Sequence, residues 1–524
     1  MSRIAIVKIH PGLNMALPQL SGDLVQAGHE TRMYFFKQYK IEEEYFNSEF
    51  SDDRNVKLEA NYTDFEEEYQ TLAAQLADFN PDVIGLSVIS LSIPEAVKTT
   101  QFLRSKFNLP IIWGGVGVTL EPEIAIPHAD IICVGEGEEV MVDLADRLDK
   151  GEDIKSIEGT WAKTEDGEII KNARRPSGSL DDISIPDWNP DKMLYITSEK
   201  VLDGAAAYKL ITDGDYQIMT QRGCPFSCSF CVESRYQEMF GKKNSLRRRS
   251  VDVVIEELVR AKESFNPQVI WFWDDVFTLN PRWLEEFLPR YKKEVGIPFW
   301  CYTYPTTHKP KLLRQLKDAG CNCISMGVQS GSERVLREVY NRPTPLDRVI
   351  EASQEIVDAG IIGYFDLISR SSFEIEEDLR STFNFLVDLP QEMNYIGVGE
   401  MKSYPTYAYT REEEAAEIDT IAKSIEGLDD KTYDYYHNLY WVARNPHLDR
   451  EEKLRIGADP AYRENPALLE KHYYAHLTVN QAIYQMRMAT ISGDHPYQMF
   501  PPPRHEHNPI AASQAPPASV SEMR

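Results

Sequence analysis

Apolar runs and amphipathic stretches alternate along the first 150 residues. Short, nearly continuous apolar segments predict strands at 4–9, 31–36, 83–88, 111–113 and 131–134. Stretches with helical periodicity predict helices at 17–27, 64–79, 94–107 and 140–148. Apolar strands separated by helices are typical of a parallel sheet that is covered on both faces. Residues 1–150 are therefore predicted to form a doubly wound α/β domain, and such domains bind ligands at the carboxyl ends of the strands.

The segment 151–205 has a different pattern and separates this domain from a second series of strands and helices. Alternation around Asp166-Gly167 predicts a β-hairpin, and LDDISIPDWNP at 180–190 predicts a linker. Further strands are predicted at 216–220, 269–273, 299–304, 323–328, 364–368 and 395–401. Helices between them are predicted at 251–265, 283–295, 311–319 and 346–359. Six such units predict a partial or closed (β/α)6 barrel over 206–405, with its active face at the carboxyl ends of the strands.

The rest of the chain has no comparable strand pattern. Residues 406–495 are predicted to be a mainly helical region that caps the barrel. Residues 496–524 are rich in proline and alanine and show no periodicity, so we expect a disordered tail.

Composition narrows the class of protein. Of the 524 residues, 42% are hydrophobic and 27% are charged, as in an ordinary globular protein. No run of about 18 apolar residues occurs, and the first residues, MSRIAIVKIH, do not have the form of a signal peptide. We therefore expect a cytoplasmic protein with no membrane span. A net charge of −27 argues against nucleic acid as a partner, because phosphate binding needs a basic surface.

The segment RGCPFSCSFC carries the most specific chemistry. It places Cys224, Cys228 and Cys231 at spacings of four and three, directly after the first predicted barrel strand. A [4Fe–4S] cluster is usually held by four cysteines. Three thiolates on one loop would leave one iron open to an external ligand, as reductive chemistry on a bound small molecule requires.

A structural zinc site is the alternative for this loop. Zinc sites usually combine C-x2-C with a second pair or with histidines. No second pair follows, and His308, the nearest downstream histidine, has no partner at ligand spacing. Cys321 and Cys323 lie on a predicted strand, where alternation places both on one face. Together with Cys133 and Cys301, they are predicted to be buried apolar residues.

The motif C-x3-C-x2-C after the first strand of a six-unit barrel resembles the radical S-adenosylmethionine (SAM) superfamily. FWDDVF at 272–277 is similar to the family's second-strand motif, and GVQSGS at 327–332 is similar to its fourth-strand motif. The segment 246–258 resembles the stretch that follows the cluster, with Ser250 as a helix N-cap. The resemblance implies a [4Fe–4S] cluster on Cys224, Cys228 and Cys231, and SAM contacts from Phe230, Asp274, Asp275, Gln329 and Ser330.

Simpler interpretations of these motifs remain. Asp274 and Asp275 could belong to a solvated loop, and Gln329 and Ser330 to an ordinary turn. The segment 364–374 also departs from the family, because it keeps Glu374 but lacks the glycines and the proline of the usual fifth-strand loop. This departure puts a SAM adenine contact at that loop in doubt.

Glycines follow two predicted strands of the first domain, at 114–117 and at 135–137, and Ser87–Ser92 follows a third. Glycines there let a large ligand approach backbone N–H groups, although they could also serve only tight turns. The pattern is not a G-x-G-x-x-G motif at the start of a βαβ unit, which disfavours a nicotinamide cofactor.

The spacing of these glycines resembles the Rossmann-like cobalamin-binding domain that precedes many radical SAM barrels, and LDDISIPDW is similar to the linker of that group. The resemblance covers roughly residues 1–400. No D-x-H-x-x-G motif is present, and His10, His29 and His128 lack that context, so cobalt is expected without a histidine from this motif. The implied cobalamin contacts are Ser87, Ser90, Gly114, Gly115, Thr119, Gly135, Glu136 and Gly137.

Both resemblances together imply a cobalamin-dependent radical SAM enzyme. The first expectation is a C-methyltransferase that cleaves SAM with its [4Fe–4S] cluster and uses methylcobalamin as methyl donor. Its partners would be a small-molecule or peptide substrate and an external electron donor such as flavodoxin or ferredoxin. One alternative is an oxidative cyclase or rearrangement enzyme without net methyl transfer. Another is a non-catalytic sensor that binds cobalamin and a metal.

Overall fold

We analysed a computed structural model of the chain. It describes residues 1–9, 15–36, 66–196, 201–212, 214–390, 395–402, 404, 406–411, 428–473, 487–488 and 490–491. The predicted tail at 496–524 lies outside the described residues.

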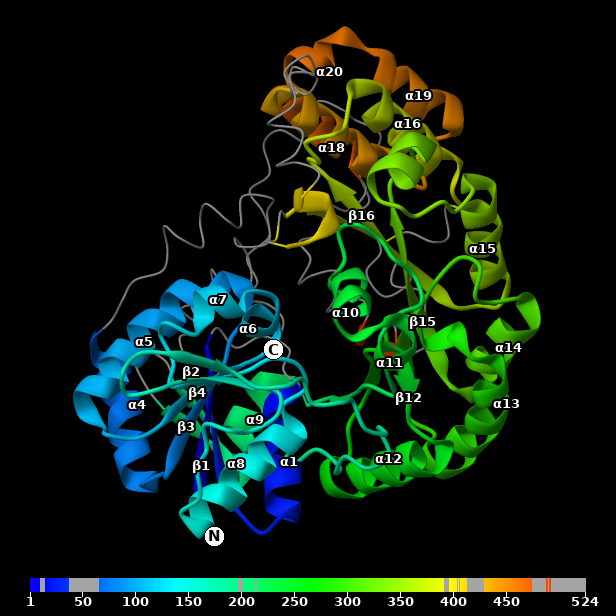
Figure 1. Ribbon diagram of the computed structural model, residues 1–524. Coiled ribbons are helices and arrows are strands. Elements are labelled where there is room, and N and C mark those ends of the chain that lie inside the picture. Colours follow the sequence, from blue (N-terminus) through cyan, green and yellow to red (C-terminus); the bar gives the residue numbers. More distant parts are fainter. Residues whose placement is uncertain are drawn as a thin grey trace.

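The N-terminal domain is a doubly wound α/β unit, as predicted (Figure 1). Six parallel strands form the centre of a nine-stranded sheet in the order β7-β6-β5-β4-β3-β1-β2-β8-β9, and the edge strands β6, β7 and β9 are antiparallel. The strands are β1 (Arg3–Ile9), β2 (Glu30–Phe36), β3 (Val83–Ser87), β4 (Ile111–Gly114), β5 (Ile131–Cys133), β6 (Thr160–Lys163), β7 (Ile169–Lys171), β8 (Met193–Ile196) and β9 (Val201–Asp203).

Helices cover both faces of this sheet, because its strands carry apolar residues on both sides. On one face, Ile4 and Ile6 of β1 pack with α1 (Ala16–Gln26) and α8 (Glu138–Lys150). On the other, Ala5 and Val7 pack with α4 (Glu66–Phe79) and α5 (Ile93–Lys106). Three short helices complete this part, α6 (Val116–Leu120), α7 (Pro122–Ala125) and α9 (Gly204–Thr212).

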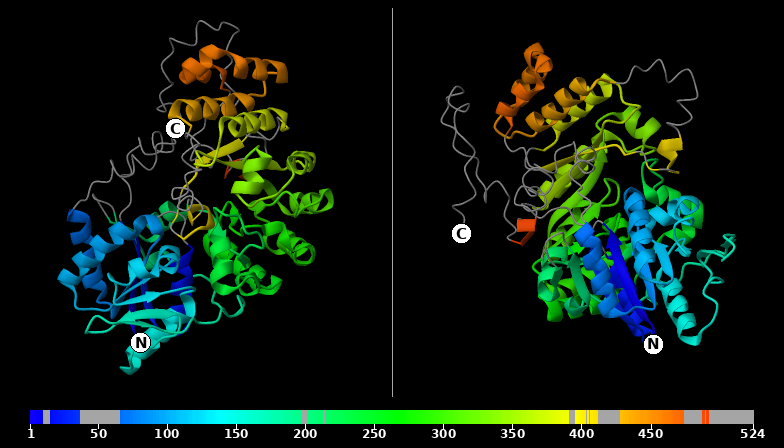
Figure 2. Two further views of the ribbon diagram at one scale, coloured as in Figure 1. Left: turned by 45° about the horizontal axis from the view of Figure 1, so that its top comes forward. Right: turned by 90° about the vertical axis from the view of Figure 1, so that its left-hand side faces the viewer.

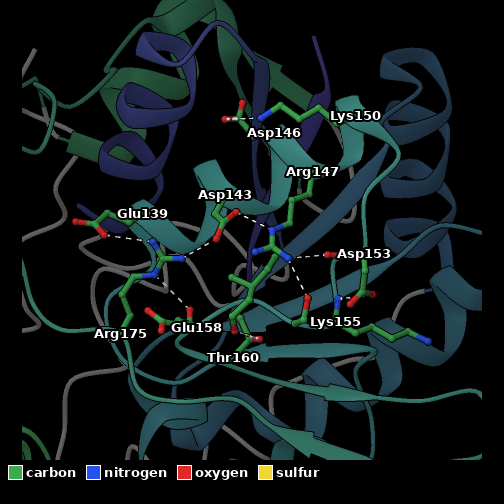
Figure 3. A network of polar contacts seen from close by, with 12 residues as sticks. Glu139, Asp143, Asp146, Arg147, Lys150, Asp153, Lys155, Glu158, Thr160 and Arg175 are labelled. Atoms are coloured by element: carbon green, nitrogen blue, oxygen red, sulfur yellow. Dashed lines mark hydrogen bonds and ion pairs between the residues drawn. The ribbon is translucent and has the colours of Figure 1, made fainter.

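The segment 151–205 is attached firmly to the N-terminal sheet. The predicted hairpin is present as β6 and β7, and β8 and β9 extend the opposite edge. Arg175 donates to Asp143 of α8 at 2.7 Å, and Arg147 donates to the other oxygen of the same carboxylate at 2.8 Å (Figure 3). Arg147 also donates to the carbonyl of Asp153 at 2.9 Å. This network fixes the chain on both sides of the hairpin to α8.

The second domain is an open six-stranded parallel barrel in the order β10-β13-β14-β15-β16-β17. All six predicted strands are present, as β10 (Tyr216–Ile218), β13 (Ile270–Phe272), β14 (Phe299–Thr303), β15 (Cys321–Gln329), β16 (Ile362–Ser369) and β17 (Tyr395–Glu400). The short pair β11 (Gln221–Arg222) and β12 (Arg247–Arg248) lies beside them. Five helices wrap the outside, namely α12 (Val251–Phe265), α13 (Pro281–Arg290), α14 (Pro310–Ala319), α15 (Leu346–Asp358) and α16 (Glu376–Asp388), whereas α10 (Val232–Phe240) faces the N-terminal domain and α11 (Lys242–Ser245) packs beside it (Figure 1). Ser250 caps α12 as predicted, by accepting from the N–H of Val253.

One prediction about the barrel strands is wrong. Cys321 and Cys323 are both buried, but they lie in different apolar clusters. Cys321 packs with the helix-covered side, whereas Cys323 packs with Trp271 and Trp300. The register with β14 skips Asn322, and this bulge breaks the alternation that would place both cysteines on one face.

The C-terminal region consists of helices, as predicted, within its described part. α18 (Asp430–Ala443), α19 (Arg450–Ala458) and α20 (Pro460–Glu464) lie beyond α16, at the end of the barrel away from the N-terminal domain (Figure 1, Figure 2). Among the described helices, none combines the length and the apolar character needed to cross a bilayer.

Candidate functional site

The three clustered cysteines lie on one loop between β11 and α10. Gly223 precedes them with φ of +86°, and a Cβ there would lie 2.2 Å from the carbonyl oxygen of Ser245. Only glycine fits this position, because other residues rarely adopt such a φ and backbone blocks the added carbon. The loop therefore turns sharply at Gly223 and carries Cys224, Cys228 and Cys231 into the mouth of the barrel.

Neighbouring elements hold the loop in place. Ser229 donates to the carbonyl of Val339 at 2.6 Å. Asn341 donates to the carbonyl of Ser227 at 2.7 Å. Gln237 of α10 donates to the carbonyl of Phe226 at 2.8 Å. These bonds fix the backbone of the loop before any ligand binds to it.

The cysteines open onto a cavity of about 180 Å³, which we call the barrel pocket. Of the residues that the resemblance assigned to SAM, Phe230, Asp275 and Gln329 line it. The full lining is Cys224, Phe226, Cys228, Phe230, Cys231, Asp275, Val276, Tyr302, Thr303, Tyr304, Gly327, Gln329, Arg342 and Asp366. The sequence motifs thus converge on one cavity at the carboxyl ends of the barrel strands.

Asp274 and Ser330 lie outside this pocket. Asp274 is fully buried and accepts from the N–H of Thr220 at 2.5 Å and of Gln221 at 3.0 Å. Arg248 also contacts Asp274, at 3.2 Å. Ser330 accepts from the N–H of Ser332 at 3.1 Å within a buried turn. The carboxylate of Asp274 therefore positions the chain just before the cysteine loop and is not open to a ligand.

Sequence reasoning missed Arg342. Its guanidinium lies 3.6 Å from the sulfur of Cys228 and donates to the carbonyl of Gly327 at 2.5 Å. It also stacks over Tyr304, 4.2 Å from the ring centroid. The side chain is 8% exposed, so a buried positive charge faces the cysteine loop. It follows the fourth strand by more than ten residues, and no motif marked it.

Several acidic groups around the cysteines have a raised pKa, which favours their neutral forms. Burial raises the pKa of Cys224 to about 12 and also raises the pKa of Cys231. Burial together with repulsion from Asp275 raises the pKa of Glu233 to about 8, and burial together with repulsion from Asp274 raises the pKa of Asp275 to about 6. A cation bound to the thiolates would reverse these shifts and release protons as it bound.

Asp366 lies on the fifth strand and lines the same pocket. Protein surrounds its carboxyl group, although the pocket keeps the side chain partly accessible. Burial raises its pKa to about 7. Glu374, the residue of the fifth-strand loop that the family shares, lies elsewhere: it is buried and accepts from the N–H of Ser371 at 2.9 Å. Glu374 therefore does not line the barrel pocket, whereas Asp366 of the same strand region does.

The cysteine loop fits a cluster better than a zinc ion. In the described part of the chain, no three His, Cys, Asp or Glu side chains converge to hold a single metal ion. A zinc ion needs all its ligands about 2.0–2.3 Å from one point, whereas each cysteine of a cubane cluster binds a different iron. The other four cysteines are buried, as predicted.

A second and larger cavity, of about 430 Å³, lies at the carboxyl ends of β1, β3, β4 and β5. We call it the domain cleft, because both domains line it. Six of the eight residues expected to bind cobalamin line it, namely Ser87, Gly114, Gly115, Gly135, Glu136 and Gly137. Thr119 lies behind the lining, where it accepts from the N–H of Gly135 at 3.1 Å and donates to the carbonyl of Gly115 at 3.0 Å. Ser90 is also outside the lining.

Glycine is required at particular points of the cleft. Gly115 has φ of +106°, and a Cβ there would lie 2.6 Å from the carbonyl oxygen of Val88. A Cβ on Gly117 would lie 2.4 Å from backbone atoms of Ile89 and Ser90. The glycines of this loop thus let α6 approach the end of β3, in addition to leaving room for a ligand.

The barrel supplies the opposite wall of the cleft, which the sequence did not predict. Gln217, Met219, Arg222 and Tyr236 line it from this side. Arg222 forms an ion pair with Glu136 at 2.7 Å and another with Glu138. Arg247 bonds to Glu136 as well. These pairs lower the pKa of Glu136 and raise that of Arg222, so the carboxylate of Glu136 holds the two domains together.

The described histidines of the N-terminal domain are engaged away from the cleft. His29 contacts Asp146 at 3.2 Å, and His128 stacks on Trp113. His10 lies outside the described residues. Neither described histidine lines the cleft.

Comparison with known families identifies both domains. The family model of the radical SAM superfamily matches residues 218–386, and that of the B12 binding domain matches residues 50–145. The chain belongs to the cobalamin-binding radical SAM family. Its radical SAM domain implies SAM and a [4Fe–4S] cluster as cofactors, and its B12-binding domain implies cobalamin. The three thiols that line the barrel pocket fit an iron–sulfur cluster in donor chemistry, and the glycines that line the domain cleft leave backbone open to a large ligand.

Individual relatives agree with this membership. An uncharacterised methyltransferase of Pyrococcus horikoshii is 29% identical over 60% of this chain and 66% of its own length. The anaerobic magnesium-protoporphyrin IX monomethyl ester cyclase of Rubrivivax gelatinosus is 25% identical over 61% of this chain and 56% of its own length. The chain thus spans between about half and two thirds of these relatives. The cobalamin-dependent SAM radical enzyme OxsB, solved with aqua-cobalamin, shares the fold with a TM-score of 0.63 at 17% identity, over 94% of this chain and 77% of its own.

Proposed function

We propose that this protein is a cobalamin-dependent radical SAM methyltransferase that methylates carbon in a small-molecule or peptide substrate. An external electron donor such as flavodoxin or ferredoxin would reduce it. The similarity to the Pyrococcus relative, which is named a methyltransferase, favours methyl transfer. The activity is a proposal for the whole protein.

The observation that carries this proposal is the shared wall between the two cavities. Met219 and Arg222 line the domain cleft, and Cys224 lines the barrel pocket. One segment, 219–224, therefore separates the two cofactor sites. A substrate at the barrel mouth would lie within reach of both, as a reaction that combines SAM cleavage with methyl transfer requires.

When bound, the cluster supplies the electron that cleaves SAM, and cobalamin carries the methyl group that is transferred. The chain's own residues bind and shield these groups. Cys224, Cys228 and Cys231 would hold the cluster, while Asp275 and Gln329 would contact SAM in the same pocket. Tyr302 and Tyr304 close the pocket on another side, next to the stacked ring of Phe226, and exclude water.

An oxidative cyclase is the second candidate, because the Rubrivivax relative is named a cyclase. The two functions differ in their products. A methyltransferase that also remethylates its cobalamin from SAM forms S-adenosylhomocysteine in addition to 5′-deoxyadenosine. A cyclase forms 5′-deoxyadenosine without S-adenosylhomocysteine.

Anaerobic reconstitution tests the proposal. The full chain would be loaded with iron, sulfide and cobalamin, reduced, and incubated with SAM, and both nucleoside products would be measured. We expect both to form. Formation of 5′-deoxyadenosine alone would favour the cyclase, and no SAM cleavage by a protein with a complete cluster would favour a sensor.

Two cysteine variants serve as a matched pair for the cluster. Cys228→Ala removes a thiol of the barrel pocket, so iron binding and SAM cleavage should be lost. Cys301→Ala removes a thiol that is also buried but lines neither cavity. It should keep the iron content and the cleavage rate of the wild type. If the Cys228 variant still cleaves SAM, the cluster assignment is wrong.

A further inference from the structure

Among the described charged side chains that line the domain cleft, every carboxylate is paired with an arginine, and one cation has no partner. Six charged side chains line it, three of each sign: Lys8, Arg222, Arg249, Glu136, Glu138 and Glu257. Arg222 pairs with both Glu136 and Glu138, as described above, and Arg249 pairs with Glu257 at 2.5 Å. Within the described part of the chain, the side chain of Lys8 has neither an ion pair nor a hydrogen bond.

The buried and unpaired side chain of Lys8 destabilises the folded protein. Its side chain is only 7% exposed, and burial alone lowers its pKa to about 8. A buried charge without a partner destabilises a fold, and a lysine is almost never fully buried unless it is paired. It lies on the same face of β1 as the apolar residues Ile4 and Ile6. Packing therefore does not explain a lysine here, and a bound anion would.

The position of Lys8 in the sheet is the one at which such domains bind ligands. β1 pairs with β2 on one side and with β3 on the other, so the strand order reverses at β1 (Figure 1). Ligands of open α/β sheets bind at this reversal, beyond the carboxyl ends of the strands. Lys8 is the last residue but one of β1, and it is paired in register with Ser87, which also lines the cleft.

We propose that Lys8 is the anion-binding residue of the cleft and that it binds the phosphodiester of the nucleotide loop of cobalamin. This inference rests on the proposed cobalamin site. The corrin ring of cobalamin carries neutral amide side chains, and the phosphodiester is its one anionic substituent. The unpaired cation of the cleft and this phosphate therefore match in charge, and an ammonium–phosphate contact is a strong, charge-assisted hydrogen bond.

A series of three ligands tests this assignment in the full-length protein. Aquacobalamin has the whole nucleotide loop, cobinamide phosphate keeps a phosphate without the ribose and base, and cobinamide lacks all three. Dissociation constants would be measured by corrin absorption or by quenching of tryptophan fluorescence, without SAM or turnover. We expect the wild type to bind cobinamide phosphate roughly tenfold to a hundredfold more tightly than cobinamide.

Lys8→Met should weaken binding of aquacobalamin and of cobinamide phosphate by roughly tenfold to a hundredfold and leave cobinamide unaffected. Lys8→Arg keeps the charge and should restore most of the difference. Without ligand, Lys8→Met should melt at the same or a higher temperature, because an unpaired buried charge is replaced by an apolar chain of similar length. Lys453→Met is the control. Lys453 is also buried, with a pKa lowered to about 8, but it lies in α19 and lines neither cavity.

The outcomes separate the two proposals. If the wild type binds none of the three corrinoids, the cobalamin site itself fails and the role of Lys8 fails with it. If the wild type binds aquacobalamin but Lys8→Met binds it equally well, only the role of Lys8 is wrong. Equal weakening of all three ligands in Lys8→Met would show a structural role and overturn the assignment. Should Lys8→Met not fold, equal wild-type affinity for cobinamide and cobinamide phosphate would overturn it as well.

Discussion

The barrel pocket and the domain cleft share the segment 219–224, yet different kinds of contact build them. In the barrel pocket, side chains from one short loop and from the barrel strands carry the chemistry, and three of its lining residues are thiols. In the domain cleft, glycines at the ends of β4 and β5 form much of one wall, and residues of the barrel close the other. The barrel pocket thus depends on the identity of its side chains, whereas the cleft depends on backbone shape and on paired charges between domains.

Because of this difference, the two cavities should respond differently to substitution. Removal of one functional group should disable the barrel pocket without changing its shape. Addition of a single carbon should disable the cleft without removing any functional group. Four predictions test the comparison, from the largest expected effect to the smallest.

The two aspartates that follow β13 should respond in opposite ways. Asp274→Ala leaves the buried Arg248 and two backbone N–H groups without their acceptor, so we expect a loss of about 3–5 kcal/mol in the free energy of unfolding. Asp275→Ala removes a carboxylate whose charge burial disfavours. It should leave stability unchanged or raised and weaken SAM binding. Urea denaturation measures the first effect and equilibrium binding the second; equal destabilisation by both variants would contradict the assignment.

Two neighbouring glycines should separate shape from chemistry in the cleft. Gly115→Ala forces a side chain into a φ of +106° and against the carbonyl of Val88. We expect it to cost about 1–3 kcal/mol of stability and to weaken cobalamin binding. Gly114→Ala places its Cβ 3.6 Å from Cys133, an ordinary contact, and should be tolerated. Thermal unfolding and corrinoid titration of both variants check this, and a Gly114 variant as weak as the Gly115 variant would refute the shape argument.

Loss of the ion pairs between the domains should reduce stability less than the changes inside either cavity. Arg222→Met leaves Glu136 and Glu138 without their shared partner. Because Arg222 is about a quarter exposed, we expect a loss of about 1–3 kcal/mol, smaller than for a fully buried pair. Arg260→Met is the control, since its pair with Glu256 is exposed and should contribute about 0–0.5 kcal/mol. Differential scanning calorimetry compares them; identical shifts would mean that the contact does not join the domains.

Titration of Asp366 should make the stability of the folded protein depend on pH. Its pKa in the folded protein is raised to about 7 by burial, so the folded state holds the proton where the unfolded state has lost it. This contribution to stability is fully present below the ordinary carboxyl pKa of about 4 and is lost as the pH rises to about 7. Asp366→Asn should remove this dependence and gain about 1 kcal/mol at about pH 8. Urea denaturation from about pH 4 to about pH 8 tests this, and parallel curves for the two proteins would refute it.

The sequence revealed most of what is local. The six barrel strands, the hairpin and the cysteine loop follow from periodicity, turn residues and spacing within short segments. The bulge at Asn322 did not, because it arises from pairing with β14. The strands β8 and β9 were missed because each is only three or four residues long and is stabilised by the sheet edge that it joins.

The site residues also divide into those with a local sequence signal and those that depend on distant parts of the chain. The spacing of Cys224, Cys228 and Cys231 within eight residues was enough to predict their shared role. The glycine loops of the cleft could be predicted because pairs of glycines follow predicted strands. The sequence could not separate Asp274 from Asp275, because adjacent residues point to opposite sides of a strand end. Lys8, Arg222 and Arg342 were also missed, because each acquires its neighbours only from chain that is distant in sequence.

The shared segment 219–224 also bears on how the protein is made. During synthesis, the N-terminal sheet emerges and can begin to fold before β10 has emerged from the ribosome. At that stage the cleft has its glycines and Lys8, but Gln217, Arg222 and Tyr236 have not yet arrived to form the facing wall. A nascent chain therefore presents half of the proposed corrinoid site, and the other half is completed by the same strand and loop that deliver the cysteines.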